Sequence, residues 1–411
     1  MLESIEMYKF DVAIIGGGAA GMMAAIWAAK NKSVVLVEKN PSLGRKILAA
    51  GNGRCNLTNR YADKTRYHGG DQDFIGQVLK QFDQAAVQKF FEDLGVVLKE
   101  EDNGRIFPRT NQAQTIIDVL VDKLQEEKVT LKTNTVVKKI MKTVNGFEII
   151  FNSGAKIEVK KIILAVGGQS SPQFGSSGDG YYWAKQLGHV VTELYPALVP
   201  IESVETWPSE ISGLKVEGKA TVTVEGKMIA EKSGDILFTH FGLSAPAIMA
   251  LAGSIESNIG REVLIHLDLF PDKTVKELDD LLTQIFGASG KKTLKNALAG
   301  LIPANLAQTI LVQKKLPFDR KSAEISKIDR LLIAKTLKDL ILTVKQLRPF
   351  KEAQVTHGGI ELNEIDVNSL QSKKTPGLYF AGEILNVDGD SGGFNLQWAW
   401  SSGYLAGQLF E

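Results

Sequence analysis

The sequence predicts an α/β protein whose main domain is assembled from both ends of the chain. Residues 10–38 are typical of a buried strand, a glycine-rich turn, a helix and a second buried strand. Residues 355–411 again combine short apolar strands with glycines and end in a helical pattern near 395–409. The stretch between them, 191–354, alternates with a period of two and then becomes helical. We therefore expect a first domain formed by residues 1–190 and 355–411, and an inserted domain over 191–354.

The elements of the first domain follow in order along the chain. After the strand–helix–strand unit at 10–38, the apolar spacing in 73–127 predicts helices, with Asn111 as the N-cap of the last one. Short strands are expected from 129 to 166, with turns at Asn145-Gly146 and at 152–154. The run IILAVGG at 162–168 predicts a buried strand that ends on glycines.

The insertion changes character part-way along. Residues 211–239 alternate apolar and polar positions, so we expect antiparallel strands there. Beyond Pro271, Thr274 and Glu277 have the spacing of a capping box, and leucines and isoleucines follow at helical spacing. Helical patterns continue to about Lys345, and we expect a helical excursion over about 272–346.

The composition excludes several classes of function. The 411 residues include 48 lysines and arginines, 47 acidic residues and one cysteine, with a formal net charge of +1. This balance leaves no global basic field, so we expect a small-molecule substrate rather than nucleic acid or an anionic membrane as the partner. The single cysteine excludes an internal disulfide and a thiolate metal site, and no metal centre is expected. The sequence makes no prediction of the oligomeric state.

Two uncharged runs, 12–29 and 236–255, have about the length needed to cross a bilayer. The first contains four glycines, and the second contains polar residues and Pro246 near its middle. Both patterns suit a strand, a turn and a buried helix better than a membrane span. The first nine residues also lack the positively charged start of a secretory signal, so we expect a cytoplasmic protein.

A dinucleotide-binding motif lies at the first strand-to-helix turn. Gly16-x-Gly18-x-x-Gly21 follows a strand and opens a helix, and Glu38 ends the next strand 22 residues after Gly16. In such a motif the first glycine permits a tight turn, the second lets the backbone approach a pyrophosphate, and the third allows close packing. The helix start supplies N–H groups for phosphate, and Glu38 can accept hydrogen bonds from a ribose diol. The pattern predicts one bound dinucleotide.

The place of the motif indicates which dinucleotide is bound. A fingerprint near the start of the chain is usual for FAD, and GSSGDG at 175–180 has its glycines in the wrong order for a second fingerprint. We therefore expect FAD as the cofactor. NAD(P)H has no evident domain of its own and is a candidate for a transient electron donor.

Longer motifs carry a more specific signal. They are LGRKILAAGNGRCNLTN at 43–59, GRIFPRTNQA at 104–113, GGQSSPQFGSSGDGY at 167–181, PALVP at 196–200, GDILFTHFGLSAP at 234–246, QVTHGGI at 354–360 and GLYFAGEILNVDGDSGGFNLQWAWSSG at 377–403. Through these motifs the whole chain resembles the family of FAD-dependent oxidoreductases that includes aminoacetone oxidase and bacterial bile-acid reductases. The resemblance implies a glutathione-reductase-like Rossmann FAD-binding domain interrupted by a β-barrel that carries a helical segment. Asn386 departs from the aspartate, and Ala245 from the glycine, that the family pattern suggests.

The resemblance also implies which residues hold the cofactor. Near the pyrophosphate and the adenosine ribose it implies Gly16, Gly18, Ala19, Ala20, Gly21, Glu38 and Lys39. Phosphate charge would be neutralised by Arg45 and Lys46. Adenine would lie against Val136 or Val137, and the ribose side would be lined by Ala165, Val166 and Gly167.

At the flavin end, the isoalloxazine would be flanked by Asn52, Gly53, Arg54, Cys55 and Asn56. The ribityl chain would be approached by Gly382 and Glu383. The N1/O2 edge, where reduced flavin carries negative charge, would face backbone N–H groups of Gly393, Phe394, Asn395 and Leu396.

His240 and His357 are the candidate catalytic residues, because histidine transfers protons near neutral pH. His240 lies in the polar turn THFG, and His357 precedes two glycines beside the C-terminal flavin segment. Each could instead be a loop histidine whose ring bonds to the backbone. Cys55 is interpreted as a small packing residue rather than a nucleophile.

The leading hypothesis is an FAD-dependent oxidoreductase that moves a hydride between a small organic substrate and flavin N5, with NAD(P)H as a candidate donor. One alternative is a flavin amine oxidase that uses oxygen. An alternative of another class is a non-catalytic, redox-sensing flavin module, with a nucleic-acid partner as a variant. That variant gains weight if the basic residues at 291–295, 314–315 and 320–321 form one exposed patch.

Overall fold

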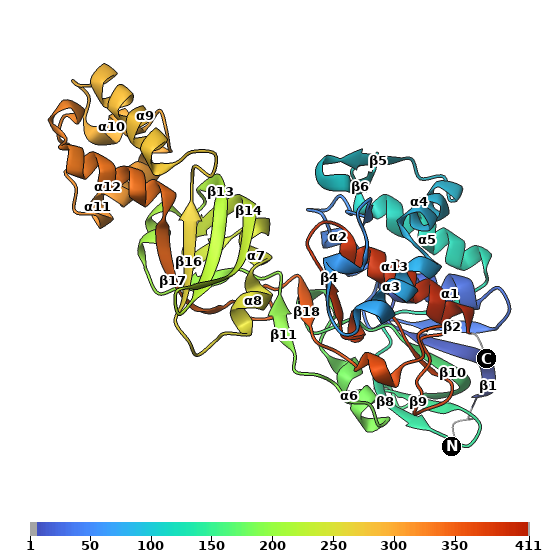
Figure 1. The fold of residues 1–411 in the computed structure, drawn as a ribbon. Coiled ribbons are helices and arrows are strands. Elements are labelled where there is room, and N and C mark those ends of the chain that lie inside the picture. Colours follow the sequence, from blue (N-terminus) through green and yellow to red (C-terminus); the bar gives the residue numbers. More distant parts are fainter. Residues whose placement is uncertain (1–5, 410–411) are drawn as a thin grey trace. The chain divides into compact units, whose positions relative to one another are not determined.

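The computed structural model describes residues 6–409, which fold into two compact units (Figure 1). Unit 1 consists of Met1–Pro196 and Ala353–Glu411, and unit 2 of Ala197–Glu352. The chain leaves unit 1 through β11 (Tyr195–Ala197) and returns through β18 (Val355–His357), and these two strands pair with each other. The boundaries expected from the sequence lie at 190/191 and 354/355.

The main sheet of unit 1 has seven strands. Its order is β7-β2-β1-β10-β9-β8, and β19 pairs with the end of β10. The strands are β1 (Glu6–Ile15), β2 (Val34–Val37), β7 (Thr130–Lys132), β8 (Val137–Lys142), β9 (Phe147–Phe151), β10 (Lys156–Leu164) and β19 (Leu378–Phe380). Strands β7, β2, β1, β10 and β19 run parallel, whereas β8 and β9 pair in antiparallel fashion.

Seven helices belong to the described part of unit 1. They are α1 (Ala19–Ala28), α2 (Arg45–Ala49), α3 (Gln72–Gln81), α4 (Gln84–Asp93), α5 (Ala113–Glu126), α6 (Asp179–Gln186) and α13 (Phe394–Gln408). Small additional sheets pair β3 (Thr58–Asn59) with β6 (Arg105–Pro108) and β6 with β5 (Leu98–Glu101), and β20 (Val387–Gly389) with β4 (Tyr67–Gly69).

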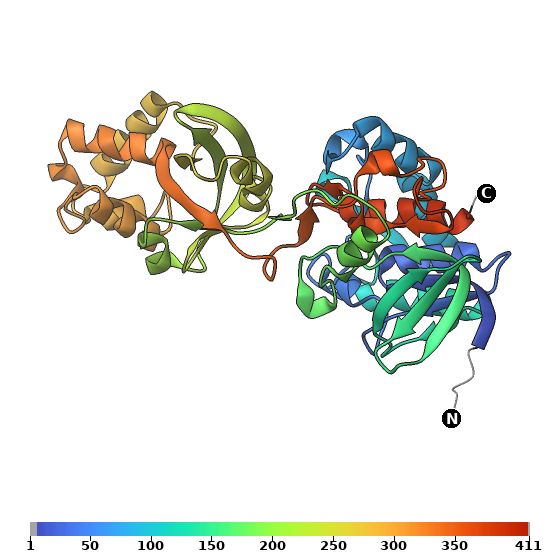
Figure 2. The same cartoon turned by 90° about the horizontal axis from the view of Figure 1, so that it is seen from below.

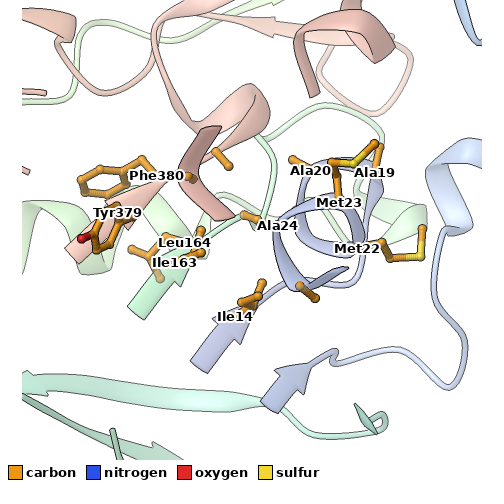
Figure 3. Close-up of a cluster of buried hydrophobic side chains, with 14 of the residues drawn as sticks. Ile14, Ala19, Ala20, Met22, Met23, Ala24, Ile163, Leu164, Tyr379 and Phe380 are labelled. Carbon is orange, nitrogen blue, oxygen red and sulfur yellow. The ribbon is translucent and has the colours of Figure 1, made fainter. Parts of the chain in front are cut away.

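The core of unit 1 lies between the parallel strands and helix α1. The central strands are continuously apolar and buried at 12–15 of β1, 34–37 of β2 and 162–164 of β10, as expected where both faces of a parallel sheet are covered. Figure 3 shows one buried cluster in which Ile163 and Leu164 of β10 lie between Phe380 of β19 and the side chains of α1. Helix α13 packs on α1 at close range, because a Cβ on Gly403 would overlap the carbonyl oxygen of Ala20.

The structure confirms the predicted strand–helix–strand unit, the hairpin turns before and after β9, and the C-terminal helix. Two predictions for 73–127 were wrong. Strands β5 and β6 interrupt the helices there, because the largely polar LKEE pairs locally with RIFP, whose Ile106 and Phe107 are buried. Asn111 is not an N-cap, since it adopts a left-handed conformation with φ of 55°, and Gln112 precedes α5 instead.

Unit 2 contains a closed barrel with the strand order β12-β15-β14-β13-β16-β17. The strands are β12 (Ile201–Ser203), β13 (Lys215–Val224), β14 (Lys227–Thr239), β15 (Gly242–Ser244), β16 (Val263–Asp268) and β17 (Leu340–Leu347). The predicted alternation is confirmed in β13, where Ala220, Val222 and Val224 are buried. Short helices α7 (Pro246–Met249) and α8 (Ala252–Glu256) follow β15.

Between β16 and β17 the chain forms four helices, α9 (Val275–Ala288), α10 (Leu294–Leu298), α11 (Ala304–Gln313) and α12 (Lys327–Lys338) (Figures 1 and 2). The predicted capping box is present, because Thr274 and Glu277 bond reciprocally at the start of α9. The helical prediction extended too far. Residues 340–347 form β17, whose alternating Leu340 and Leu342 point into the barrel unit while Ile341 is exposed.

Every helix within residues 6–409 is too short or too polar to span a bilayer. Across the same residues, histidine, cysteine and acidic side chains do not gather in any group of three or more that could hold a metal ion.

Candidate active site

Four parallel strands of unit 1 end at one edge of the main sheet. Strands β2, β1, β10 and β19 lie side by side, and the chain continues beyond them at Glu38, Gly16, Ala165 and Ala381. Ligands of open α/β sheets bind beyond the carboxyl ends of the strands. This edge therefore brings together four of the segments that the sequence assigns to FAD.

The glycine motif at this edge has one open and two crowded positions. Gly16 has a φ of +106°, and a Cβ there would overlap the carbonyl oxygen of Ala165. A Cβ on Gly21 would overlap the carbonyl oxygen of Gly16. A Cβ on Gly18 would meet no atom within 4 Å. The first and third glycines thus shape the turn, while Gly18 borders open space that a pyrophosphate at the start of α1 can use.

The carboxylate of Glu38 holds the loop that surrounds it. The residue is buried, and its two oxygens accept hydrogen bonds from the backbone N–H groups of Gly17 at 2.7 Å and Asn40 at 2.8 Å. Arg45 donates to the side-chain oxygen of the same Asn40 at 2.9 Å. Each carboxylate oxygen has two lone pairs, so Glu38 can brace the loop and still accept from a ribose. The sequence did not reveal this bracing role.

Lys39 and Lys46 are both engaged in ion pairs. The ammonium group of Lys39 bonds Asp179 at 2.9 Å, at the start of α6. Lys46 donates to Glu383 at 2.7 Å and to the hydroxyl of Ser170 at 3.1 Å. The two lysines thus bring positive charge to the edge of the sheet while their own partners hold them in place.

Glu383 is the centre of a polar cluster. Its second oxygen accepts from the hydroxyl of Ser170 at 2.9 Å and from the backbone N–H of Thr356 at 2.7 Å. The hydroxyl of Thr356 in turn accepts from the backbone N–H groups of Gln169 and Ser170. Sequence reasoning missed Ser170 and Thr356, which tie β18 to the loop after β10. Gly382, with φ of +80°, lets the chain pass close to Ala20 of α1.

The predicted isoalloxazine loop has unusual backbone geometry. Asn52, Gly53 and Cys55 all have positive φ. Arg54 pairs with Glu101 at 3.0 Å, which holds the loop to β5. The Cys55 thiol is fully buried, and burial raises its pKa to about 12. The thiol therefore stays protonated at neutral pH, which favours the packing role over that of a nucleophile.

The start of α13 offers backbone donors next to an unpaired acceptor. Gly393 precedes the helix with φ of +101°, and the first N–H groups of a helix have no acceptor within it. A Cβ on Gly393 would lie 2.9 Å from the side-chain oxygen of Asn56. That oxygen is buried and has no hydrogen-bond partner within residues 6–409. Buried acceptors are rarely left unpaired. A flavin ring, which carries both an N–H and carbonyl oxygens, suits this set of donors and acceptor.

The side chain of Asn395 has a structural role, in addition to the predicted role of its backbone N–H at the flavin. Its side chain accepts from the N–H of Gly389 at 2.8 Å and donates to the Gly389 carbonyl at 2.8 Å. The side chain therefore fixes β20 against the first turn of α13. Phe394 is buried, and Leu396 packs at the edge of the core.

His357 forms a pair with Asp388. Nδ1 of His357 lies 2.7 Å from a carboxylate oxygen of Asp388, which is buried on β20. The ring stacks on Tyr195, with centroids 6.2 Å apart. The hydrogen bond to Asp388 raises the pKa of His357. Asp388 and Gly389 are neighbours on β20, and Gly389 bonds the side chain of Asn395 in the first turn of α13. Strand β20 therefore connects His357 to the start of α13. The sequence named His357 but missed Asp388, although NVDGD lies within a motif of the resemblance.

The remaining predicted cofactor residues lie near the same edge. Val136 is 39% exposed, and its carbonyl accepts from the N–H of Asn152, while Val137 begins β8. Ala165 continues β10 by donating to Ile15, and Val166 and Gly167 follow it. Their contacts with a cofactor stay predictions.

His240 belongs to unit 2. It is exposed in the turn between β14 and β15, beside the ring of Phe241. Its catalytic role stays a prediction.

Residues 10–409 match the family described as the HI0933-like protein Rossmann domain. The chain belongs to this family. Two relatives align over nearly its whole length. The 3-dehydro-bile acid delta(4,6)-reductase of Clostridium scindens is 33% identical over 402 residues, covering 97% of this chain and 98% of the relative. The ribosomal RNA dihydrouridine synthase of Escherichia coli is 32% identical over 404 residues, covering 98% of each chain.

The fold also recurs in a solved structure. The 3-ketosteroid delta1-dehydrogenase of Sterolibacterium denitrificans superposes with a TM-score of 0.53 at 15% identity, covering 97% of this chain and 98% of that one. This match shows a shared fold. With the family established, the protein is an FAD-dependent oxidoreductase, as the sequence motifs predicted.

Proposed function

We propose that this FAD-dependent oxidoreductase is a reductase that saturates a carbon–carbon double bond conjugated to a carbonyl group. The observation that carries the proposal is the pair of full-length relatives. One is named for reducing double bonds of a 3-oxo bile acid, and the other for making dihydrouridine, which is uridine with its ring double bond saturated. Both bonds are conjugated to a carbonyl. A common chemistry for the two relatives is therefore hydride addition to an electron-poor carbon.

The reaction has simple atom and electron requirements. When bound, reduced flavin supplies a hydride from N5. The hydride adds to the carbon distant from the carbonyl, and a proton adds to the carbon next to it. NADH or NADPH is the proposed donor that reduces the flavin again by hydride transfer, and one proton from solvent replaces the proton given to the substrate. The protein has to position the substrate and deliver the second hydrogen as a proton.

The residues of unit 1 suit these tasks. In the proposed complex, the glycine turn and the start of α1 would hold the pyrophosphate, and Glu38 and Glu383 would accept hydrogen bonds from the sugar hydroxyls. The N–H dipoles at the start of α13 would face the flavin edge where negative charge develops on reduction. His357 holds a proton at Nε2 and gives it to the substrate, while Asp388 keeps Nδ1 bonded and favours the protonated ring.

The proposal includes the finer features that the sequence resemblance implies. The FAD domain has the glutathione-reductase-like arrangement, with the barrel unit as an insertion that supports substrate selection. The one cysteine is a buried thiol, which suits a reducing compartment such as the cytoplasm. An amine oxidase that passes electrons to oxygen is the second route, and it differs from the reductase in needing no nicotinamide.

Anaerobic titration of the purified protein with NADH and NADPH tests the proposal. We expect either nucleotide to bleach the flavin absorption bands. Flavin bands that ignore both nucleotides but bleach with a small amine would support the oxidase instead. Purified, folded protein without stoichiometric flavin would contradict the cofactor assignment itself.

A further inference from the structure

Two carboxylates of unit 1 lie on the same side of β20. Asp388 is in the middle of this strand, and Asp390 directly follows its end. Residues two positions apart along a strand point to the same face, about 7 Å from each other. Asp390 continues the pairing of β20 with β4, because its backbone N–H donates to the carbonyl of Arg66 at 2.9 Å. The two carboxylates therefore project in the same direction.

Each of these carboxylates bonds a histidine from a different strand. Oδ1 of Asp388 lies 2.7 Å from Nδ1 of His357 on β18. Oδ1 of Asp390 lies 2.9 Å from Nε2 of His68 on β4. One face of β20 thus carries two imidazole–carboxylate pairs, and the proposed reaction uses only the pair that contains His357.

Strand pairing places His68 beside the carboxylate of the other pair as well. Strands β4 and β20 are antiparallel, and His68 is directly opposite Asp388. Residues opposite each other in such a pair have Cβ atoms about 5 Å apart. His68 and His357 are therefore both neighbours of Asp388. The hydrogen bond to Asp388 raises the pKa of His357, whereas the positive charge of protonated His68 acts in the opposite direction and lowers it.

The charge of His68 can change without leaving Asp390 alone. The second oxygen of Asp390 lies 3.5 Å from Nη1 of Arg66, and an arginine side chain stays charged in proteins. Asp390 therefore keeps a cationic partner when His68 is neutral. The side chain of His68 is 53% exposed, against 34% for His357, so solvent reaches the ring of His68 more freely.

The other charged groups around the two rings are engaged elsewhere or point to solvent. Those on the turn before β4 and on the start of α3 bond one another or cap backbone N–H groups: Asp63, Lys64, Asp71 and Asp73. On the side of His357, Tyr195 of β11 stacks on the ring and brings a phenol rather than a charge, and Glu193 is exposed. The nearby charges that remain belong to the two pairs and to Arg66.

We infer that His68 is a positioning residue for the proton that His357 gives to the substrate. Asp388 holds this proton on the ring of His357, and the charged form of His68 opposes it, so that Nε2 can release the proton to a substrate carbon. The inference rests on the proposed function for the role of His357. It needs no further reactant, because one proton passes from His357 to the substrate and one proton from solvent replaces it.

The inference predicts how the charge at position 68 changes the acid. Without a positive charge there, the pKa of His357 should rise, because only the attraction of Asp388 remains. With a permanent positive charge there, the pKa of His357 should fall. A general acid works in its protonated form, so the alkaline limb of the pH profile of kcat should move in the same direction as the pKa. The parent should lie between these two limits, since its two rings titrate as a coupled pair.

Titration of the histidine rings by NMR tests the inference without substrate or electron donor. The full-length protein with FAD bound carries ¹³C-labelled histidine, and the Cε1–H signals of its five histidines are assigned by single substitutions. His68→Gln removes the charge, and His68→Lys keeps a charge that can still bond Asp390. The matched control is His266→Gln, which removes the imidazole of another histidine–carboxylate pair, with Nδ1 2.7 Å from Asp339 on unit 2. Flavin absorbance and the unfolding temperature report that each variant is folded.

We expect the pKa of His357 to increase in the order His68→Lys, parent, His68→Gln, and the His266→Gln control to match the parent. With any acceptor that the parent reduces, the alkaline limb of the kcat profile should follow the same order. An unchanged His357 titration in both His68 variants would overturn the inference. Shifts of equal size and sign in the two variants would overturn it as well, because they would reflect a change of structure rather than of charge.

The two levels of the account fail separately. A parent that binds FAD but reduces no acceptor would contradict the proposed function, while the titration would still decide whether His68 acts on the proton of His357. A parent that reduces an acceptor, together with a His357 pKa that ignores the charge at position 68, would contradict the role of His68 alone.

Discussion

Replacing Gly18 by alanine should separate cofactor binding from folding. A Cβ at Gly18 meets no protein atom within 4 Å, and the backbone angles of φ −81° and ψ −168° suit alanine. We expect the free energy of unfolding of the cofactor-free protein to change by no more than about 1 kcal/mol. The added carbon would instead occupy the space through which a phosphate oxygen reaches the backbone.

The expected loss of FAD affinity follows from that contact. A hydrogen bond to a charged group contributes about 1.5–3 kcal/mol, so the Kd for FAD should rise roughly 10- to 150-fold. Titration of the cofactor-free protein with FAD, followed by quenching of flavin fluorescence, measures the Kd. Urea unfolding of the same preparation measures stability.

Two further glycine variants serve as controls. Gly287→Ala also enters open space, but on α9 of unit 2, and it should leave the FAD affinity unchanged. Gly21→Ala should destabilise folding, because its Cβ would overlap the carbonyl oxygen of Gly16. A Gly18→Ala protein that binds FAD as tightly as the parent would refute the reasoning.

Three other predictions follow from individual contacts. Asp388→Asn should lower the pKa of His357, because a neutral amide replaces the carboxylate that raises it, and the alkaline limb of the pH profile of kcat should move to lower pH. Hydrogen bonds from Lys160 and Ser33 lower the pKa of Asp11 from 3.8 to about 2. The free energy of unfolding that Asp11 contributes is therefore fully present above pH 3.8 and is lost as the pH falls toward 2. Asp11→Asn should remove this pH dependence of stability between pH 3.8 and 2, as measured by urea unfolding. Iodoacetamide should fail to modify Cys55 until the protein unfolds, and mass spectrometry of labelled protein would reveal the opposite result.

Local signals predicted much of unit 1. The glycine motif could be recognised because the strand before it, the glycines and the acid after the next strand all lie within 30 residues. Strands β5 and β6 were missed, since LKEE and RIFP are short and the first is largely polar. Strand β17 was assigned to a helix because LIL at its start fits a buried helix as well as a strand.

The polar clusters of the site could not be read from sequence. Ser170 and Glu383 bond across 213 positions, and His357 and Asp388 across 31. Such pairs depend on which strand ends the sheet places together, and periodicity does not encode that. The basic runs of unit 2 show the same limit, because only the backbone pairing of 291–295 with 318–322 brings two of them side by side.

The central claim is that reduced enzyme passes a hydride to a carbon–carbon double bond conjugated to a carbonyl. Anaerobic mixing of dithionite-reduced enzyme with a uridine-containing RNA, and separately with a 3-oxo-4,6-diene steroid, tests this without assuming a physiological donor. The account predicts that one acceptor restores the flavin absorption bands while its product gains two hydrogen atoms by mass spectrometry. Two results together would contradict the account. The flavin would stay bleached with both acceptors, and oxygen would reoxidise it at once in a protein that turns over small amines.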